Sequence, residues 1–194
     1  MTQSSIAICG VQQKGLSHET DVTKWADIQE TSGKYCGPAS SNATWDGITP
    51  NWDANGYRLP TEAEWECAAR GGETDTDTDV WAGTTDSTKL GDYAWYKDNS
   101  SEKAHEVMKL KPNGYGLYDM SGNVCEWCWD RYGDYTAAAE ANPTGAAGGS
   151  GHVFRGGGRA ISEAAAARAS CREKITPESR YAFIGFRLAR SCSN

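Results

Sequence analysis

The segment RLPTEAEWECAARGG specifies a capped helix, the local structure this sequence determines most strongly. Thr61 is a preferred N-cap residue, and Glu64 three positions later completes a capping box. Gly71 or Gly72 can end the helix in the left-handed conformation that glycine adopts without strain. The fold must therefore place its core against one short helix. Two i,i+4 pairs could face that core: Ala63 with Cys67, and Trp65 with Ala69.

Outside this helix the chain is rich in loop-forming residues. It has 194 residues, of which 22 are glycine, with eight tryptophans and nine tyrosines available for burial. This length suits one domain over residues 1–194. A second helix is predicted in DVTKWADIQETSG, between Asp21 or Thr23 and Gly33. Strands are predicted around Tyr93–Tyr96 and in VFRGG and FIGFRLAR, and GYGLYDMSGNVCEWCWDRYG alternates aromatic and polar residues around a tight SGN turn.

The charge of the chain excludes some classes of partner. A net charge of -7, with lysine and arginine dispersed along the sequence, provides no basic stripe for phosphates, so we expect no nucleic-acid partner. No run of about 18 apolar residues occurs, so we expect no membrane-spanning segment. The N-terminus lacks a basic start and an apolar signal core, and any export signal or anchor would lie outside this chain.

Seven cysteines cannot all pair within one chain. Cys125 and Cys128 form a CxxC motif, but no second Cys/His pair with zinc-finger spacing accompanies it, and the histidines are far apart in the sequence. The alternative is that both thiols pack as small apolar groups in a strand or turn.

Several ordered segments carry a family resemblance. GYRLPTEAEWECAARGG, PNGYGLYDMSGNVCEW, VFRGG and IGFRLAR resemble signature segments of the formylglycine-generating-enzyme, or sulfatase-modifying-factor, domain. The resemblance implies an α+β, C-type lectin-like fold with two helices, a mixed antiparallel sheet and long irregular loops.

The enzymes of that family oxidise a cysteine of a sulfatase with paired reactive cysteines that follow the RGG-like segment. Here Ile161 and Ala166 approximately occupy the two positions, and only Cys171 remains nearby. Since one sulfur cannot replace a pair, we expect no catalytic residues and no formylglycine formation. A thiol-dependent oxidase stays as an alternative, as does a structural surface domain without diversification.

The region 154–183 also resembles the diversified segment of variable proteins of diversity-generating retroelements. In those systems a reverse transcriptase scrambles adenines in AAC codons, which removes Asn. No Asn stands between Arg155 and Phe183, whereas Glu163, Glu173, Lys174 and Glu178 cannot arise from AAC and are expected to be constant or to come from other codons. The predicted variable, ligand-binding residues are Arg159, Ile161, Ser162, Ala164, Ala165, Cys171, Ser179, Tyr181, Ala182 and Phe183.

The local sequence of this region favours a different structure. SEAAAARASCREK has an N-cap at Ser162 and an alanine run, which predict a helix. The family resemblance instead implies strand and loop here, and we give the resemblance precedence.

A changeable binding surface requires a constant scaffold. We expect Trp65, Trp127, Trp129 and Phe186 to belong to that scaffold as packed side chains. The ligand would be an unknown protein or glycan outside the cell. The domain would be a monomer, at the cell surface or exported.

A structural Ca²⁺ is a further implication of the resemblance. Members of the family hold calcium near the SGNVCEW segment, where Asn123 and Glu126 offer hard oxygen ligands. The alternative interpretation is that Asn123 adopts a left-handed turn conformation and Glu126 pairs with an arginine.

Overall fold

The structure is a computed structural model of the whole chain, and it describes residues 51–52, 56–71, 80–135, 138–158, 163–177, 179 and 181–190. The helix expected over 21–33 lies outside these residues. The helices are α2 (Glu62–Arg70), α3 (Lys97–Ser100) and the 3₁₀ helices Ser87–Asp92 and Ala164–Ala167. The strands are β1 (Tyr57–Arg58), β2 (Cys125–Arg131), β3 (His152–Arg155), β4 (Arg172–Ile175), β5 (Ile184–Gly185) and β6 (Ala189–Arg190).

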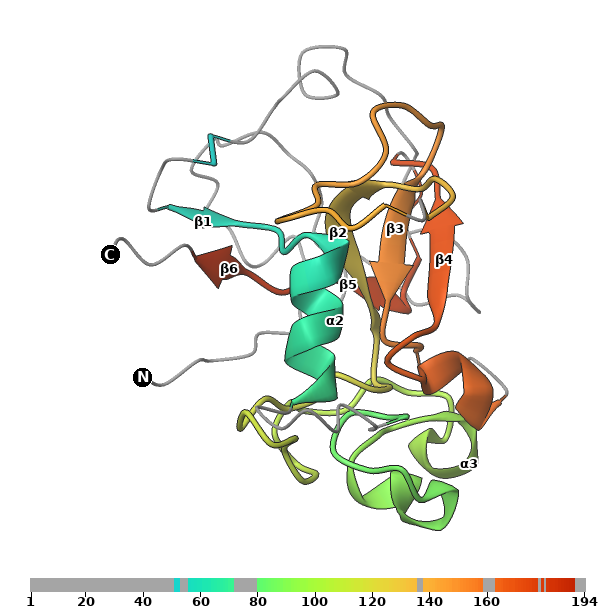
Figure 1. Cartoon of the computed structure of the whole chain (residues 1–194). Helices are drawn as coiled ribbons and strands as arrows, with labels where there is room; N and C mark the ends of the chain where they lie inside the picture. Colours follow the sequence, from blue (N-terminus) through green and yellow to red (C-terminus); the bar gives the residue numbers. More distant parts are fainter. Residues whose placement is uncertain are drawn as a thin grey trace.

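A four-stranded mixed sheet is the centre of the fold, with the strand order β4-β3-β2-β5. β3 runs antiparallel to both of its neighbours, whereas β2 and β5 are parallel. β1 and β6 form a separate antiparallel pair that brings Tyr57 opposite Arg190. Figure 1 shows α2 in front of β2, and the 3₁₀ helix Ala164–Ala167, in orange-red, beyond the end of β3 and the start of β4. A mixed α+β architecture with few helices is confirmed.

Helix α2 has the predicted ends. The Thr61 hydroxyl accepts from the backbone N–H of Glu64, and the Glu64 carboxylate accepts from the Thr61 N–H, which completes the capping box. Gly71 ends the helix at φ 61°. Of the two predicted core pairs, only Trp65 with Ala69 is correct; Ala63 and Cys67 are exposed because they lie on the face turned away from the sheet.

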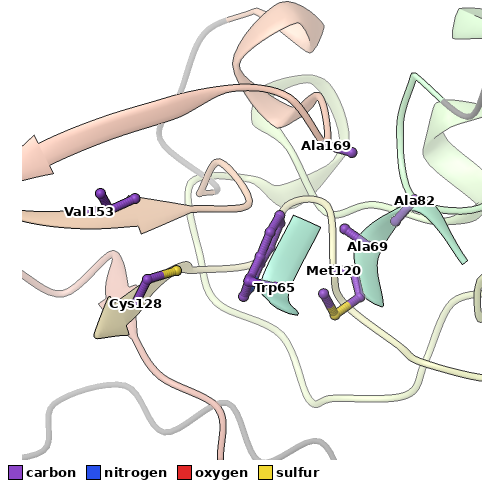
Figure 2. Close-up of a cluster of buried hydrophobic side chains, with 7 residues drawn as sticks. All are labelled: Trp65, Ala69, Ala82, Met120, Cys128, Val153 and Ala169. Atoms are coloured by element: carbon purple, nitrogen blue, oxygen red, sulfur yellow. The ribbon is translucent and has the colours of Figure 1, made fainter. Parts of the chain in front are cut away.

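The hydrophobic core joins α2 to the sheet. Figure 2 shows Trp65 at the centre of a cluster with Ala69, Ala82, Met120, Cys128, Val153 and Ala169, all buried. Along β2, Glu126, Cys128 and Asp130 point toward α2, and Cys125, Trp127 and Trp129 point to the opposite face, because side chains alternate along a strand. Of the side chains expected in the scaffold, Trp65 is buried, while Trp127, Trp129 and Phe186 are half-buried.

The segment around Tyr93–Tyr96 is not the predicted strand. It connects the 3₁₀ helix Ser87–Asp92 to α3, and only an isolated bridge joins Trp95 to Gly122. The aromatic residues that suggested a strand pack elsewhere, since Trp95 stacks on His105 with ring centroids 3.8 Å apart. Aromatic content reflects burial as much as strand pairing.

The alanine run forms one 3₁₀ turn, Ala164–Ala167, and the chain then becomes extended at Arg168 and enters β4. The resemblance therefore predicted this segment better than its helix propensity. The Ala164 carbonyl accepts from the indole Nε1–H of Trp81, and the Ala167 carbonyl accepts from the Ser121 hydroxyl. These tertiary bonds take up carbonyls that a continuing α-helix would need for its own ladder.

Candidate functional site

Several strand termini meet at one end of the four-stranded sheet. The register pairs Cys125 at the start of β2 with Ile184 at the start of β5, and Arg155 at the end of β3 with Arg172 at the start of β4. The residues that follow β3, precede β4 and precede β5 therefore share this end, where β3 points downward in Figure 1. Sequence segments far apart become neighbours here. Among the described variable candidates, Ala164, Ala165, Cys171 and Phe183 lie close to these strand ends, whereas Ser179 bonds to Thr176, just after β4 and near the opposite end of the sheet.

Two glycines bring these segments into close contact. Gly157 has φ 63°, and a Cβ on it would lie 2.5 Å from the carbonyl oxygen of Ala166. A Cβ on Gly158 would lie 3.2 Å from the carbonyl oxygen of Phe183 and 3.3 Å from the Cys125 sulfur. The glycines after β3 thus allow the 3₁₀ turn on one side and the start of β5 on the other to pack against the backbone.

The described variable candidates differ in exposure. Ala165 is exposed, whereas Ala164, Cys171, Ser179, Tyr181 and Phe183 are half-buried. The rings of Tyr181 and Phe183 stack, with centroids 4.9 Å apart. Ala182 is only 3% exposed, so its side chain points into the protein rather than toward a ligand. Arg159, Ile161 and Ser162 lie outside the described residues.

The backbone of this surface is held through main-chain carbonyls. Trp81 Nε1 donates to the Ala164 carbonyl at 2.6 Å, and the Ser121 hydroxyl donates to the Ala167 carbonyl at 2.8 Å. In addition, Arg155 Nη1 donates to the carbonyl of Cys171 at 2.8 Å. The backbone N–H of Cys125 donates to the carbonyl of Phe183 at 2.7 Å. None of these bonds uses a side chain of a predicted variable residue.

The cysteines of the CxxC motif pack as apolar groups, as the alternative interpretation held. Cys125 and Cys128 are both 0% exposed and point to opposite faces of β2. Burial raises the pKa of Cys125 to about 12 and the pKa of Cys128 well above its ordinary value. Burial also raises the pKa of the half-buried Cys171 thiol. Each of these sulfurs therefore stays protonated at neutral pH and is a poor nucleophile.

The oxygens proposed for calcium already have partners. Asn123 has φ 60°; its Oδ1 accepts from the His105 N–H, and its Nδ2 donates to the His105 carbonyl. Glu126 Oε2 accepts from Trp65 Nε1, and Arg187 donates to both Glu126 oxygens. A cation at Glu126 would face the Arg187 guanidinium, so these residues do not fit a calcium site. The alternative interpretation, a left-handed Asn123 and a Glu126–Arg187 ion pair, is confirmed.

Sequence reasoning missed the residues that hold the predicted variable segment. Trp81 and Ser121 lie 83 and 46 positions before the carbonyls to which they donate. No local pattern marks a contact over such a separation.

Among the described residues, no helix combines the length and apolar character needed to cross a bilayer.

The fold and this surface define an α+β domain in which a compact sheet carries a loop-rich end. The model of the sulfatase-modifying factor enzyme 1-like domain matches residues 20–192, and the chain belongs to this family. The resemblance expected from the RLPTEAEW and VFRGG segments is therefore confirmed.

Individual relatives include proteins of different kinds. The solved structure of Treponema denticola variable protein 1 is 47% identical, with a TM-score of 0.72, over 79% of this chain and 54% of that one. A formylglycine-generating enzyme of Streptomyces coelicolor is 32% identical over 76% of this chain and 51% of its own. The serine/threonine-protein kinase pkn1 of Chlamydia pneumoniae is 34% identical over 77% of this chain and 24% of its own. The chain thus spans about half or less of the length of these relatives.

Proposed function

We propose that this domain is a ligand-binding protein whose surface at the end of the sheet is diversified by a retroelement. The scaffold would be of the C-type lectin-like kind. Its side chains at Arg159, Ile161, Ser162, Ala164, Ala165, Cys171, Ser179, Tyr181 and Phe183 would vary, with Ala182 varying only within the limits of a buried position. The likeness to a treponemal variable protein supports this assignment.

One observation carries the proposal. Three hydrogen bonds that position the surface end on the backbone carbonyls of Ala164, Cys171 and Phe183, and their donors are Trp81, Arg155 and Cys125, none of them a predicted variable residue. Every amino acid offers the same carbonyl, so a side chain can change while the loop keeps its position. A binding protein that must alter its target without losing its fold needs this separation.

The thiol-dependent oxidase is a weaker candidate. A nucleophilic role needs a thiolate, but burial keeps Cys125 and Cys128 protonated, and Ala166, at one of the two approximate family positions, has no sulfur. The ligand in our proposal is a protein or glycan outside the cell. The domain acts there as a monomer, at the cell surface or exported.

Sequencing the gene across many isolates tests the proposal. We expect differences to cluster between Phe154 and Phe183, at the adenine positions of a nearby repeat rich in Asn codons. Codons for Trp81, Ser121 and Arg155 should be constant in the same isolates. An invariant segment without such a repeat would leave a non-diversified surface domain as the better interpretation.

A further inference from the structure

The sheet face that points away from α2 carries a row of side chains outside the predicted variable set. Trp127 of β2 is paired with Phe154 of β3, and Phe154 is paired with Glu173 of β4. Residues directly opposite in antiparallel strands project from the same face, with Cβ atoms about 5 Å apart. An indole, a phenyl ring and a carboxylate therefore stand next to one another.

The carboxylate in this row has no neutralising partner among the residues that the structure describes. Glu173 is exposed and, within the described part of the chain, makes no side-chain hydrogen bond or ion pair. The adjacent cations of β4 project from the opposite face of the sheet. Arg172 pairs there with Glu62, and Lys174 lies over the Tyr132 ring. As far as the described residues go, the Glu173 carboxylate can therefore attract a positive charge from a ligand.

The groups next to the row allow a cation to approach. Burial lowers the pKa of His152, whose ring meets the Trp127 ring edge-on with centroids 6.5 Å apart, so the imidazole is neutral at pH 7. Arg131, farther along the face, is engaged with the Gly149 carbonyl. Glu173 lies two residues after Cys171, which directly precedes β4, and its negative charge adds to the effect of burial in raising the pKa of the Cys171 thiol. The row therefore borders the proposed variable surface.

We propose that Trp127, Phe154 and Glu173 form a constant subsite for a lysine or arginine side chain of a protein ligand. A cation is attracted both by aromatic rings and by a carboxylate. This inference rests on the proposed function for its ligand class. Glu codons cannot arise from AAC, so Glu173 would persist while its neighbours change. Each variant would then share one requirement, a basic side chain on the ligand.

A titration with small probes tests the subsite directly. Nα-acetyl-arginine amide is added to the whole chain, and the indole Nε1–H of Trp127 is followed by NMR, assigned by its loss in Trp127→Phe. The matched neutral probe is Nα-acetyl-citrulline amide, which keeps the shape but lacks the charge. We expect a saturable shift with the arginine compound alone. Glu173→Gln should weaken this binding about tenfold.

The control variant is Glu140→Gln, which removes the same charge from another exposed position and should bind as the wild type does. Phe154→Leu, which keeps an apolar side chain without the ring, should also weaken binding. Equal responses to the two probes, an unchanged affinity in Glu173→Gln, or no response of the wild type would each overturn the subsite. The isolate sequences test diversification separately. A diversified surface without this subsite would show clustered differences among the isolates but no selective binding of the arginine probe.

Discussion

The indole Nε1–H of Trp65 donates to Glu126 Oε2 at 2.7 Å, and both side chains are 1% exposed. Trp65 comes from α2 and Glu126 from β2, so this bond joins the helix to the sheet inside the core. Arg187 completes the arrangement by donating to both carboxylate oxygens. The position suggested for calcium is therefore a structural junction between distant segments.

Glu126→Gln should destabilise the domain strongly. The amide removes the negative charge and presents an N–H₂ group to one of the existing donors, which leaves Arg187 without its counter-charge. Removing one partner of a buried ion pair costs about 3–5 kcal/mol. Urea unfolding measures the difference, with Glu140→Gln as the exposed control. A loss similar to that of the control would contradict the structural role of Glu126.

Ser121→Ala and Ala165→Ser should affect stability very differently. The Ser121 hydroxyl accepts from the Ala82 N–H at 3.0 Å and donates to the Ala167 carbonyl at 2.8 Å, and both bonds are lost in the alanine variant. The expected cost is about 1–3 kcal/mol. Ala165 is exposed, so its change should stay within about 0.5 kcal/mol. Thermal unfolding of the two variants would argue against a backbone-held surface if their losses were equal.

Stability should depend on pH through Asp130. Burial raises the pKa of this carboxyl to about 6, against a usual value of about 3.9 in an unfolded chain. The folded state therefore holds the proton more tightly, so the contribution of Asp130 to stability is complete below about pH 4 and is lost as the pH rises through about 6. Asp130 Oδ2 accepts from the Glu62 N–H at 2.8 Å, a bond that an amide oxygen can also accept.

Asp130→Asn should accordingly gain stability relative to the wild type as the pH rises from about 4 to 6. Other groups titrate in this range, so the quantity to follow is the difference in unfolding free energy between variant and wild type, measured by urea at several pH values. A difference that is constant with pH would show that Asp130 titrates normally.

Thiol labelling should separate the described cysteines by exposure. Cys67 lies on the exposed face of α2, while Cys125 and Cys128 are buried with raised pKa values. Brief treatment with iodoacetamide at pH 8, followed by mass spectrometry of peptides, should modify Cys67 and leave the buried pair unmodified. The pair should react once urea is added. Fast labelling of Cys125 in the native protein would instead indicate an accessible thiolate.

Local features were predictable wherever a short segment supplies its own partners. The ends of α2 depend on Thr61, Glu64 and Gly71, all within one helix, so their hydrogen bonds could be assigned from spacing. The strand in VFRGG and the left-handed conformation of Asn123 were likewise predictable from the residues of one short segment. The family itself could be identified because its segments are contiguous stretches in a fixed order.

The tertiary structure decided what depends on distant partners. The alanine run gives one 3₁₀ turn instead of a helix because Trp81 and Ser121 take its carbonyls, and Ala182 is buried although its neighbours Tyr181 and Phe183 are not. The row Trp127, Phe154 and Glu173 exists only through strand register. Sequence patterns record hydrogen bonds and periodicity within a segment, whereas pairing across the sheet depends on the free energy of the whole packed chain.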